Sequence, residues 1–290
     1  TVIYVGKSVN LHRRVMSYFS HSYSRKGYLA RMIPEIKEIQ WRECPHELIA
    51  LLEEEDEVKR LNPRFNSELR DYGKYYYIAV TDGPYPRFFL TKDMVGNVFF
   101  GPFFRRFLAE KVFEFATDIA GLRTCQRMKG GCVRGELGHC MRPCIADVSE
   151  MYSRNSDTVL RFLKGMDKSF IRMVDRFMEE LAESGEFEKA AFIRDNRKYL
   201  KFYFRRASFV RSFSENPVLF TASDGYAILL ERGRILMTSE KGITRSSALA
   251  RLTENKLSLT SPELETIRLF DRGNILFSWM QKKGGRAVLL

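Results

Sequence analysis

The stretch that decides the fold lies at the start of the chain and reads Tyr4-Val5-Gly6-Lys7-Ser8-Val9-Asn10-Leu11-His12-Arg13-Arg14-Val15. Residues 1–5 are an apolar run that predicts a strand, which Gly6 ends. Asn10 is a favoured N-cap residue and predicts a helix that continues to about residue 19. The sequence therefore predicts a strand, a glycine turn and a helix within a small α/β unit spanning residues 1–70.

This arrangement gathers reactive side chains on one side of the predicted turn. Tyr4 and Lys7 would lie beside the helix start, with Arg14 one turn beyond Asn10 and Tyr18 one turn further. Hydrolysis of a phosphodiester needs a general base, cations for the developing charge and usually a carboxylate-held metal. A plain strand-turn-helix with a half-buried tyrosine and solvated basic residues would give the same pattern, so periodicity alone leaves both interpretations open.

Composition narrows the class of protein. Apolar residues make up 44% of the 290, which is enough for packed cores, and no run reaches the roughly 20 apolar residues of a membrane span. The formal net charge is +12 and the isoelectric point about 9.5, which favours a polyanionic partner such as nucleic acid. Surface lysines that only maintain solubility are the alternative. We expect a cytoplasmic, monomeric protein that binds nucleic acid and no membrane.

The rest of the chain alternates between short strands and helices, so the predicted class is α/β (α+β). Further helices are expected over residues 26–33, 46–61, 104–119 and, two or three in number, 148–206, with one near 262–270. Further strands are expected at 36–41, 75–80, 87–90, 97–100, 226–230 and 234–238. We divide the chain into a first unit at 1–70, a strand-containing linker region at 71–147, a helical region at 148–206 and a C-terminal α/β segment of unknown role at 207–290.

Four of the five cysteines are crowded into one glycine-rich loop: Cys125, Cys132, Cys140 and Cys144. Such crowding indicates a zinc site or an iron–sulfur cluster, and the lack of a C-x-x-C pair argues against an ordinary zinc ribbon. Free thiols in a loop are the remaining alternative.

The opening stretch resembles the second half of the GIY-YIG nuclease motif of the UvrC family. The resemblance implies that Tyr4 is a candidate general base, that Arg14 contacts the scissile phosphate, and that Lys7 and Tyr18 occupy further active-site positions. The first strand of the motif, with its GIY tyrosine, is not among these 290 residues. Because Thr1 lies inside an apolar run and is not Met, we expect the sequence to be an excerpt.

The family also has a metal-binding glutamate on a later helix, followed by an asparagine. The matching segments here are Ala50-Leu51-Leu52-Glu53-Glu54 and Asn62-Pro63-Arg64-Phe65-Asn66. Glu54 is thereby implied as the ligand of Mg²⁺ or Mn²⁺, and Asn66 as the family's asparagine. Glu54 lies in an acidic run, 53–57, where the helical wheel places Glu55 nearer the centre of the apolar stripe.

Two later landmarks follow in the family's order. The cysteine loop resembles that of UvrC, which implies a [4Fe-4S] cluster, with zinc as the alternative. A predicted helical hairpin over 168–205, turning at Ser184-Gly185, resembles the UVR motif that docks onto a UvrB-like protein. The residues implied in that contact are Phe187, Ala190, Ala191 and Arg194.

Taken together, the resemblance implies a metal-dependent DNA endonuclease of nucleotide excision repair that makes the 3′ incision near a lesion in a UvrB–DNA complex. The architecture is similar to that of the shorter UvrC homologue Cho. A non-catalytic adaptor with a decayed nuclease fold, binding DNA and UvrB, is the main alternative. A homing or restriction nuclease of the same superfamily is a weaker one, since the cysteines and the UVR-like hairpin argue against it.

Overall fold

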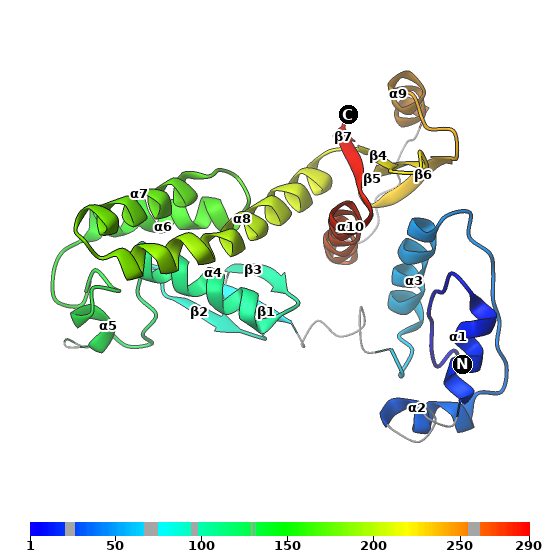
Figure 1. Ribbon diagram of the computed structural model, residues 1–290, viewed down its shortest axis with the longest axis horizontal. Coiled ribbons are helices and arrows are strands. Elements are labelled where there is room, and N and C mark those ends of the chain that lie inside the picture. Colours follow the sequence, from blue (N-terminus) through cyan, green and yellow to red (C-terminus); the bar gives the residue numbers. More distant parts are fainter. Residues whose placement is uncertain (21–26, 67–74, 94–97, 129, 131, 255–261) are drawn as a thin grey trace. The chain divides into compact units, whose positions relative to one another are not determined.

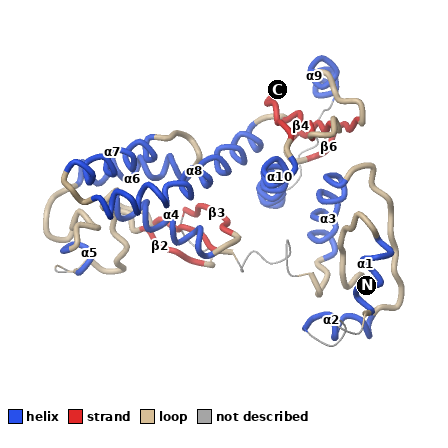
Figure 2. The backbone as a smooth tube through the Cα atoms, viewed as in Figure 1, coloured by secondary structure: helices blue, strands red, loops and turns tan. Residues whose placement is uncertain are grey.

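The computed structural model describes residues 1–290 except 21–26, 67–74, 94–97, 129, 131 and 255–261 (Figure 1). The chain forms two compact units, one of residues 72–211 and one that combines residues 1–71 with 212–290. We call them the central unit and the terminal unit. Helices and strands occur in both (Figure 2), so the predicted mixed class is confirmed. No helix in the described part of the chain has the length and apolarity needed to cross a bilayer.

The central unit is built on a three-stranded antiparallel sheet with the order β2-β1-β3. Its strands, Tyr76–Val80, Phe88–Thr91 and Val98–Phe103, lie close to the three short runs between Gly and Pro turns that were predicted as strands. Ile78 of β1 pairs with Leu90 on one side and Phe100 on the other. Four of the five β1 side chains are buried, so this strand forms the centre of the sheet.

Helices cover the sheet in successive layers (Figure 1). Helix α4 (Arg106–Ile119) packs on all three strands, and α6 (Ser149–Leu163), α7 (Ser169–Glu183) and α8 (Phe187–Glu215) lie over it. Gly165, with a φ of +67°, ends α6 where the backbone of Ala207 and Ser208 passes so closely that a Cβ would clash. The tyrosine OH of Tyr203, on α8, donates to the Leu163 carbonyl at 2.9 Å inside this core. The short helix α5 (Val133–Glu136) lies in the cysteine-rich loop.

The C-terminal part of the terminal unit is a four-stranded antiparallel sheet with the order β6-β5-β4-β7. β5 (Ala227–Glu231) and β6 (Arg234–Ser239) were predicted, whereas β4 (Val218–Ala222) and β7 (Gly285–Leu289) were not. Helix α9 (Arg245–Glu254) packs on β6, and α10 (Pro262–Lys283) packs on β7 and on α3. Helix α10 is thus far longer than the predicted 262–270.

The N-terminal part contains α1 (Leu11–Phe19), α2 (Gly27–Met32), a 3₁₀ turn (Ile33–Glu35) and α3 (Glu47–Leu61), close to the predicted helices. The strands predicted at 1–5 and 36–41 are wrong, because neither segment is assigned to a strand. A strand needs a hydrogen-bonded neighbour. Residues 3–5 instead bond to Phe65 and to the side chain of Asn66.

Candidate active site

The N-terminal segment is held against the chain that follows α3. The Phe65 N–H donates to the Ile3 carbonyl at 3.1 Å. The Asn66 side chain then contacts both polar groups of the Val5 backbone: its Oδ1 accepts from the Val5 N–H at 2.9 Å, and its Nδ2 donates to the Val5 carbonyl at 2.8 Å. Asn66 therefore fixes the backbone of the residue that follows Tyr4.

Gly6 makes room for the phenol of Tyr4. A Cβ on Gly6 would lie 2.8 Å from a ring carbon of Tyr4 and 2.9 Å from its hydroxyl oxygen. Any other residue would push the ring aside. The glycine of the Tyr4-Val5-Gly6 sequence thus serves the placement of the phenol as well as the turn.

Helix α1 presents Arg14 and Tyr18 to that phenol. Asn10 caps the helix, accepting from the Arg13 N–H at 2.8 Å. The Tyr18 hydroxyl donates to the Tyr4 oxygen at 3.2 Å, and the Arg14 guanidinium carbon lies 5.0 Å from the centre of the Tyr18 ring. The predicted cluster of two phenols and a guanidinium is therefore present in the folded chain.

Against the effect of its burial, Tyr4 and Tyr18 raise the pKa of Arg14. Partial burial acts to lower the pKa of Arg14, but hydrogen bonding with Tyr4 and the charges of both phenols outweigh it. The pKa of Arg14 is raised as a result, so the guanidinium stays charged in this cluster.

Lys7 contacts the first residue of α3, a carboxylate that the sequence analysis did not single out. Its Nζ lies 2.5 Å from Glu47 Oε1. This hydrogen bond is the largest cause of the lowered pKa of Glu47, which Lys283, 3.8 Å away, lowers further. In the sequence, the one sign of a special role for Glu47 is its position at the start of α3, directly after the N-cap residue His46.

The acidic run of α3 separates into structural and solvent-facing members. Glu55 is fully buried, as the helical wheel indicated, and pairs with Lys59 and Arg272. Glu53 pairs with Arg42 at 2.9 Å, and Glu57 with Arg60 at 2.5 Å. The side chains around Glu54 thus have structural partners of their own.

Glu54 itself is half-buried and lies seven residues beyond Glu47. Residues at this spacing share a face of a helix two turns apart, so Glu54 lies on the face of α3 that contacts Lys7. Magnesium is commonly held by one or two carboxylates together with water and substrate phosphate, so one glutamate is a sufficient protein donor for it. In the described ranges, no three or more His, Cys, Asp or Glu side chains are grouped so as to hold a metal by themselves.

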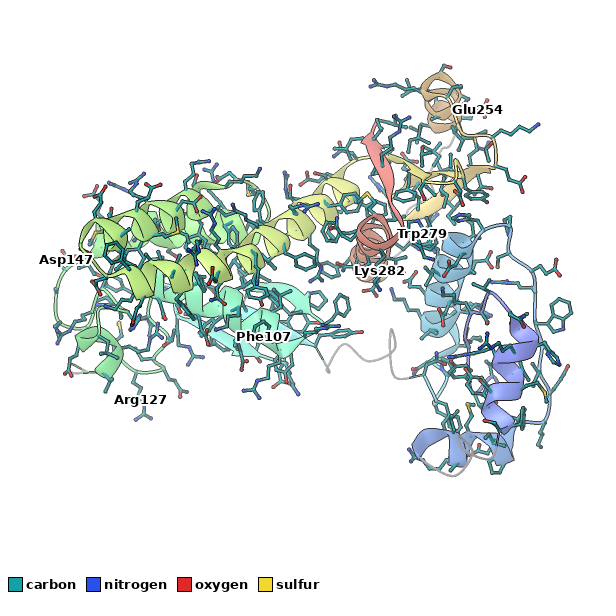
Figure 3. The ribbon with its side chains drawn as sticks, viewed as in Figure 1. Phe107, Arg127, Asp147, Glu254, Trp279 and Lys282 are labelled. Carbon is teal, nitrogen blue, oxygen red and sulfur yellow. The ribbon has the colours of Figure 1, made fainter. Side chains whose placement is uncertain are left out.

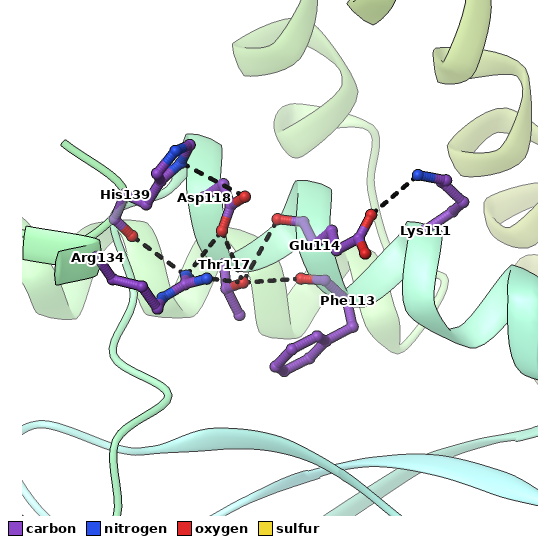
Figure 4. Close-up of polar contacts among 7 residues, drawn as sticks. All are labelled: Lys111, Phe113, Glu114, Thr117, Asp118, Arg134 and His139. Atoms are coloured by element: carbon purple, nitrogen blue, oxygen red, sulfur yellow. Dashed lines mark hydrogen bonds and ion pairs between the residues drawn. The ribbon is translucent and has the colours of Figure 1, made fainter. Parts of the chain in front are cut away.

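The cysteine-rich loop is anchored to the end of α4 by polar contacts (Figure 4). Arg134 Nη2 lies 2.7 Å from Asp118 Oδ1, and His139 lies 3.4 Å from the same carboxylate. Burial raises the pKa of the Cys140 thiol, and the charges of Cys132 and Cys125 raise it further, so these three thiols lie within electrostatic range. All four loop cysteines are free and half-buried.

The UVR-like segment forms the predicted hairpin of α7 and α8, with Gly185 in the turn at a φ of +81°. Ala190 is buried, which lets the helices approach closely, whereas Phe187 is 69% exposed. Arg194 is also exposed and pairs with Asp195 at 2.9 Å. The outer side of this hairpin therefore offers an apolar ring and a cation to solvent.

Comparison with known proteins gives this geometry its context. Residues 1–67 match the family model described as a UvrC-like GIY-YIG domain. The chain is 30% identical over 287 residues to the UvrABC system protein C of Flavobacterium johnsoniae, an alignment that covers 92% of this chain and 46% of that protein. It is 32% identical over 235 residues to the protein of the same name from Clostridium perfringens, covering 77% of this chain and 36% of the relative.

The chain belongs to the UvrC family. The alignment to the Methanococcoides burtonii UvrABC system protein C is 24% identical but runs along 99% of this chain, so the relationship extends beyond the nuclease domain to the cysteine loop and the α7–α8 hairpin. The chain spans about half the length or less of these UvrC relatives. No solved structure matches it.

Proposed function

We propose that this chain is the part of a nucleotide excision repair endonuclease that makes the 3′ incision near a lesion, with a divalent metal held by Glu54. The observation that carries the proposal is the contact of Tyr18 with Tyr4 beside Arg14, within a UvrC-like GIY-YIG domain. Hydrolysis of a phosphodiester needs a general base, cations and usually a metal ligand, and a phenol, a guanidinium, an ammonium and a carboxylate can fill these roles.

Tyr4 is the proposed general base. Its oxygen accepts a hydrogen bond from Tyr18, and the phenol also lies within hydrogen-bonding reach of Arg14. Tyr4 would take the proton of the attacking water. Tyr18 would hold the phenol in place.

Arg14 and Lys7 are the proposed phosphate ligands. Arg14 is an exposed residue and is charged, so it can donate to phosphate oxygens as their negative charge grows. Lys7 is held by Glu47 and would exchange that contact, in whole or in part, for the phosphate. Asn66 acts behind them by fixing the backbone after Tyr4.

Glu54 is the proposed ligand of Mg²⁺ or Mn²⁺. When bound, such an ion supplies positive charge to the leaving oxygen of the phosphodiester. A [4Fe-4S] cluster held by Cys125, Cys132, Cys140 and Cys144, with zinc as the alternative, would serve as a structural centre of the central unit. The α7–α8 hairpin, through Phe187, Ala190, Ala191 and Arg194, would bind a UvrB-like protein that delivers lesion DNA.

The test is nicking of lesion-containing DNA by the full-length protein with its UvrB-like partner, with the cut position mapped. Arg14→Ala should slow 3′ nicking by about 10²–10³-fold, the usual loss for one donor to a charged transition state. Arg13→Ala removes the neighbouring exposed arginine and serves as the matched control, expected to change the rate little. Undiminished nicking by Arg14→Ala would contradict the proposal. If the unmodified protein binds its UvrB-like partner but nicks no DNA at any metal concentration, the non-catalytic adaptor is favoured instead.

A further inference from the structure

Helix α8 carries a row of cations on the side turned to solvent. Arg194, Lys198, Lys201 and Arg205 are all exposed. Their spacing of four, three and four residues places them along one line on the helix surface. We call these four residues the basic stripe, which extends for about 16 Å at 1.5 Å per residue.

The opposite side of α8 is the one that packs. Tyr199 meets Phe107 of α4 edge to face, with ring centres 5.1 Å apart. The buried Arg206 donates to the Pro102 carbonyl at 2.7 Å, and Tyr203 bonds to α6. Packing therefore fixes the direction of the stripe without using its cations.

Three of the four stripe cations form no ion pair among the described residues, although the charge of Asp195 also acts on Lys198. Between residues 194 and 205 the single acidic residue is Asp195, which lies about 100° around the helix from Arg194 and pairs with it. Lys198 lies over the Tyr199 ring at 5.3 Å. Across the ion pairs of the described residues, Lys198, Lys201 and Arg205 have no carboxylate partner.

We propose that Lys198, Lys201 and Arg205 of the basic stripe bind the phosphate backbone of DNA, which gives the central unit a DNA contact separate from the nuclease site and from Arg194. A line of exposed cations at regular spacing suits a polyanion, because each cation placed on a phosphate releases a condensed counterion. An acidic protein would also attract the stripe, but the net charge of +12 and the nuclease chemistry of the first domain favour DNA. This inference extends the proposed function.

The experiment compares two triple variants of the full chain that lose the same charge. Lys198→Gln/Lys201→Gln/Arg205→Gln removes the stripe, and glutamine keeps the helix propensity. Lys164→Gln/Arg172→Gln/Arg176→Gln removes three exposed cations at the end of α6 and on α7. Binding of both variants to an undamaged duplex, and to one of its strands alone, is measured between 50 and 200 mM salt, the range over which phosphate contacts are lost.

The stripe variant should reduce the slope of log affinity against log salt by about 2 to 3, since each lost phosphate contact contributes about 0.9 for duplex and about 0.7 for single strands. The control variant should keep the slope of the unmodified chain. Equal loss in both variants would mean a general charge effect and would overturn the proposal. An unchanged slope in the stripe variant would also overturn the proposal, even if that variant no longer binds a UvrB-like protein.

Lys201→Gln alone, expected to lower the duplex slope by about 1, tests the same claim if the triple variant unfolds. The experiment measures DNA binding and not cleavage, so its result tests the stripe separately from the nuclease assignment. A chain that binds through the stripe but does not nick DNA would leave this inference standing, and a chain that nicks without the stripe contact would leave the nuclease assignment standing.

Discussion

Arg272 on α10 donates a hydrogen bond from Nε to Oε2 of Glu55 on α3 across 3.1 Å, with both side chains almost completely buried. The same guanidinium contacts Asp56 and the Gly233 carbonyl. Lys59 of α3 bridges Glu55 and Asp271. The helix that carries Glu54 is thus joined to the C-terminal helix by buried charges, and residues at both ends of the sequence build one unit (Figure 3).

Arg272→Met should lower the free energy of unfolding of the terminal unit by about 3–5 kcal/mol, because it leaves the buried Glu55 without one of its cations. Both tryptophans of the chain, Trp41 and Trp279, lie in this unit, so denaturant unfolding followed by tryptophan fluorescence reports on it. Arg251→Met, at an exposed arginine of α9, is the control. Equal midpoints for the two variants would rule out a structural role for the buried pair.

Asn66→Asp should destabilise the terminal unit by about 1 kcal/mol, the lower end of the cost of a polar group left without its hydrogen bond, because the Val5 carbonyl is only partly buried. The aspartate keeps an oxygen for the Val5 N–H but cannot donate to the Val5 carbonyl. Nicking should fall as well, since Val5 follows Tyr4. Arg64→Ala, an exposed neighbour, should change neither quantity by as much. If Asn66→Asp leaves unfolding unchanged, the two backbone contacts do not hold the segment.

The Lys7–Glu47 pair should make stability depend on pH in one direction. The hydrogen bond from Lys7 lowers the pKa of Glu47 in the folded chain. Its contribution is therefore present above the ordinary glutamate pKa of about 4.3 and is lost as the pH falls through the lower folded value. The difference in melting temperature between the unmodified chain and Glu47→Gln should be largest near pH 6 and shrink below about pH 4. A difference that grows toward acid would contradict the pairing.

Metal analysis of protein purified without oxygen tests the cysteine loop. The unmodified chain and Cys44→Ser, whose thiol lies outside the loop, should hold the same iron or zinc content. Cys140→Ser should lose it, because a four-cysteine site is left with three ligands. Binding should weaken toward acid, since the raised pKa of Cys140 must be overcome before the thiolate can bind. Equal metal in Cys140→Ser and Cys44→Ser would exclude the loop as the site.

The local signals of the sequence predicted the helices well and placed Arg14 and Tyr18 near Tyr4. The cap at Asn10 and the four-residue step from Arg14 to Tyr18 are short-range features, and the folded chain brings both side chains to Tyr4. Burial of Glu55 likewise followed from the helical wheel.

Contacts between residues far apart in the sequence could not be predicted from local patterns. Residues 1–5 have the composition of a strand, yet their backbone is bonded to Asn66, sixty-one positions from Val5. The contact between Glu55 and Arg272 spans 217 positions, and no periodicity connects them. Strand β7 has little alternation and is recognised only through its pairing with β4.

The most direct test of the account is the single-turnover rate of 3′ nicking by Glu54→Gln and Glu53→Gln across a magnesium titration. Both changes remove one charge from adjacent residues of α3, but only Glu54 is proposed to hold the metal. We predict a loss of about 10²-fold or more for Glu54→Gln that added magnesium does not restore. Glu53→Gln, whose carboxylate pairs with Arg42, should nick within a few-fold of the unmodified protein. Full activity of Glu54→Gln, or an equal loss in both variants, would contradict the assignment of this helix as the metal-binding element.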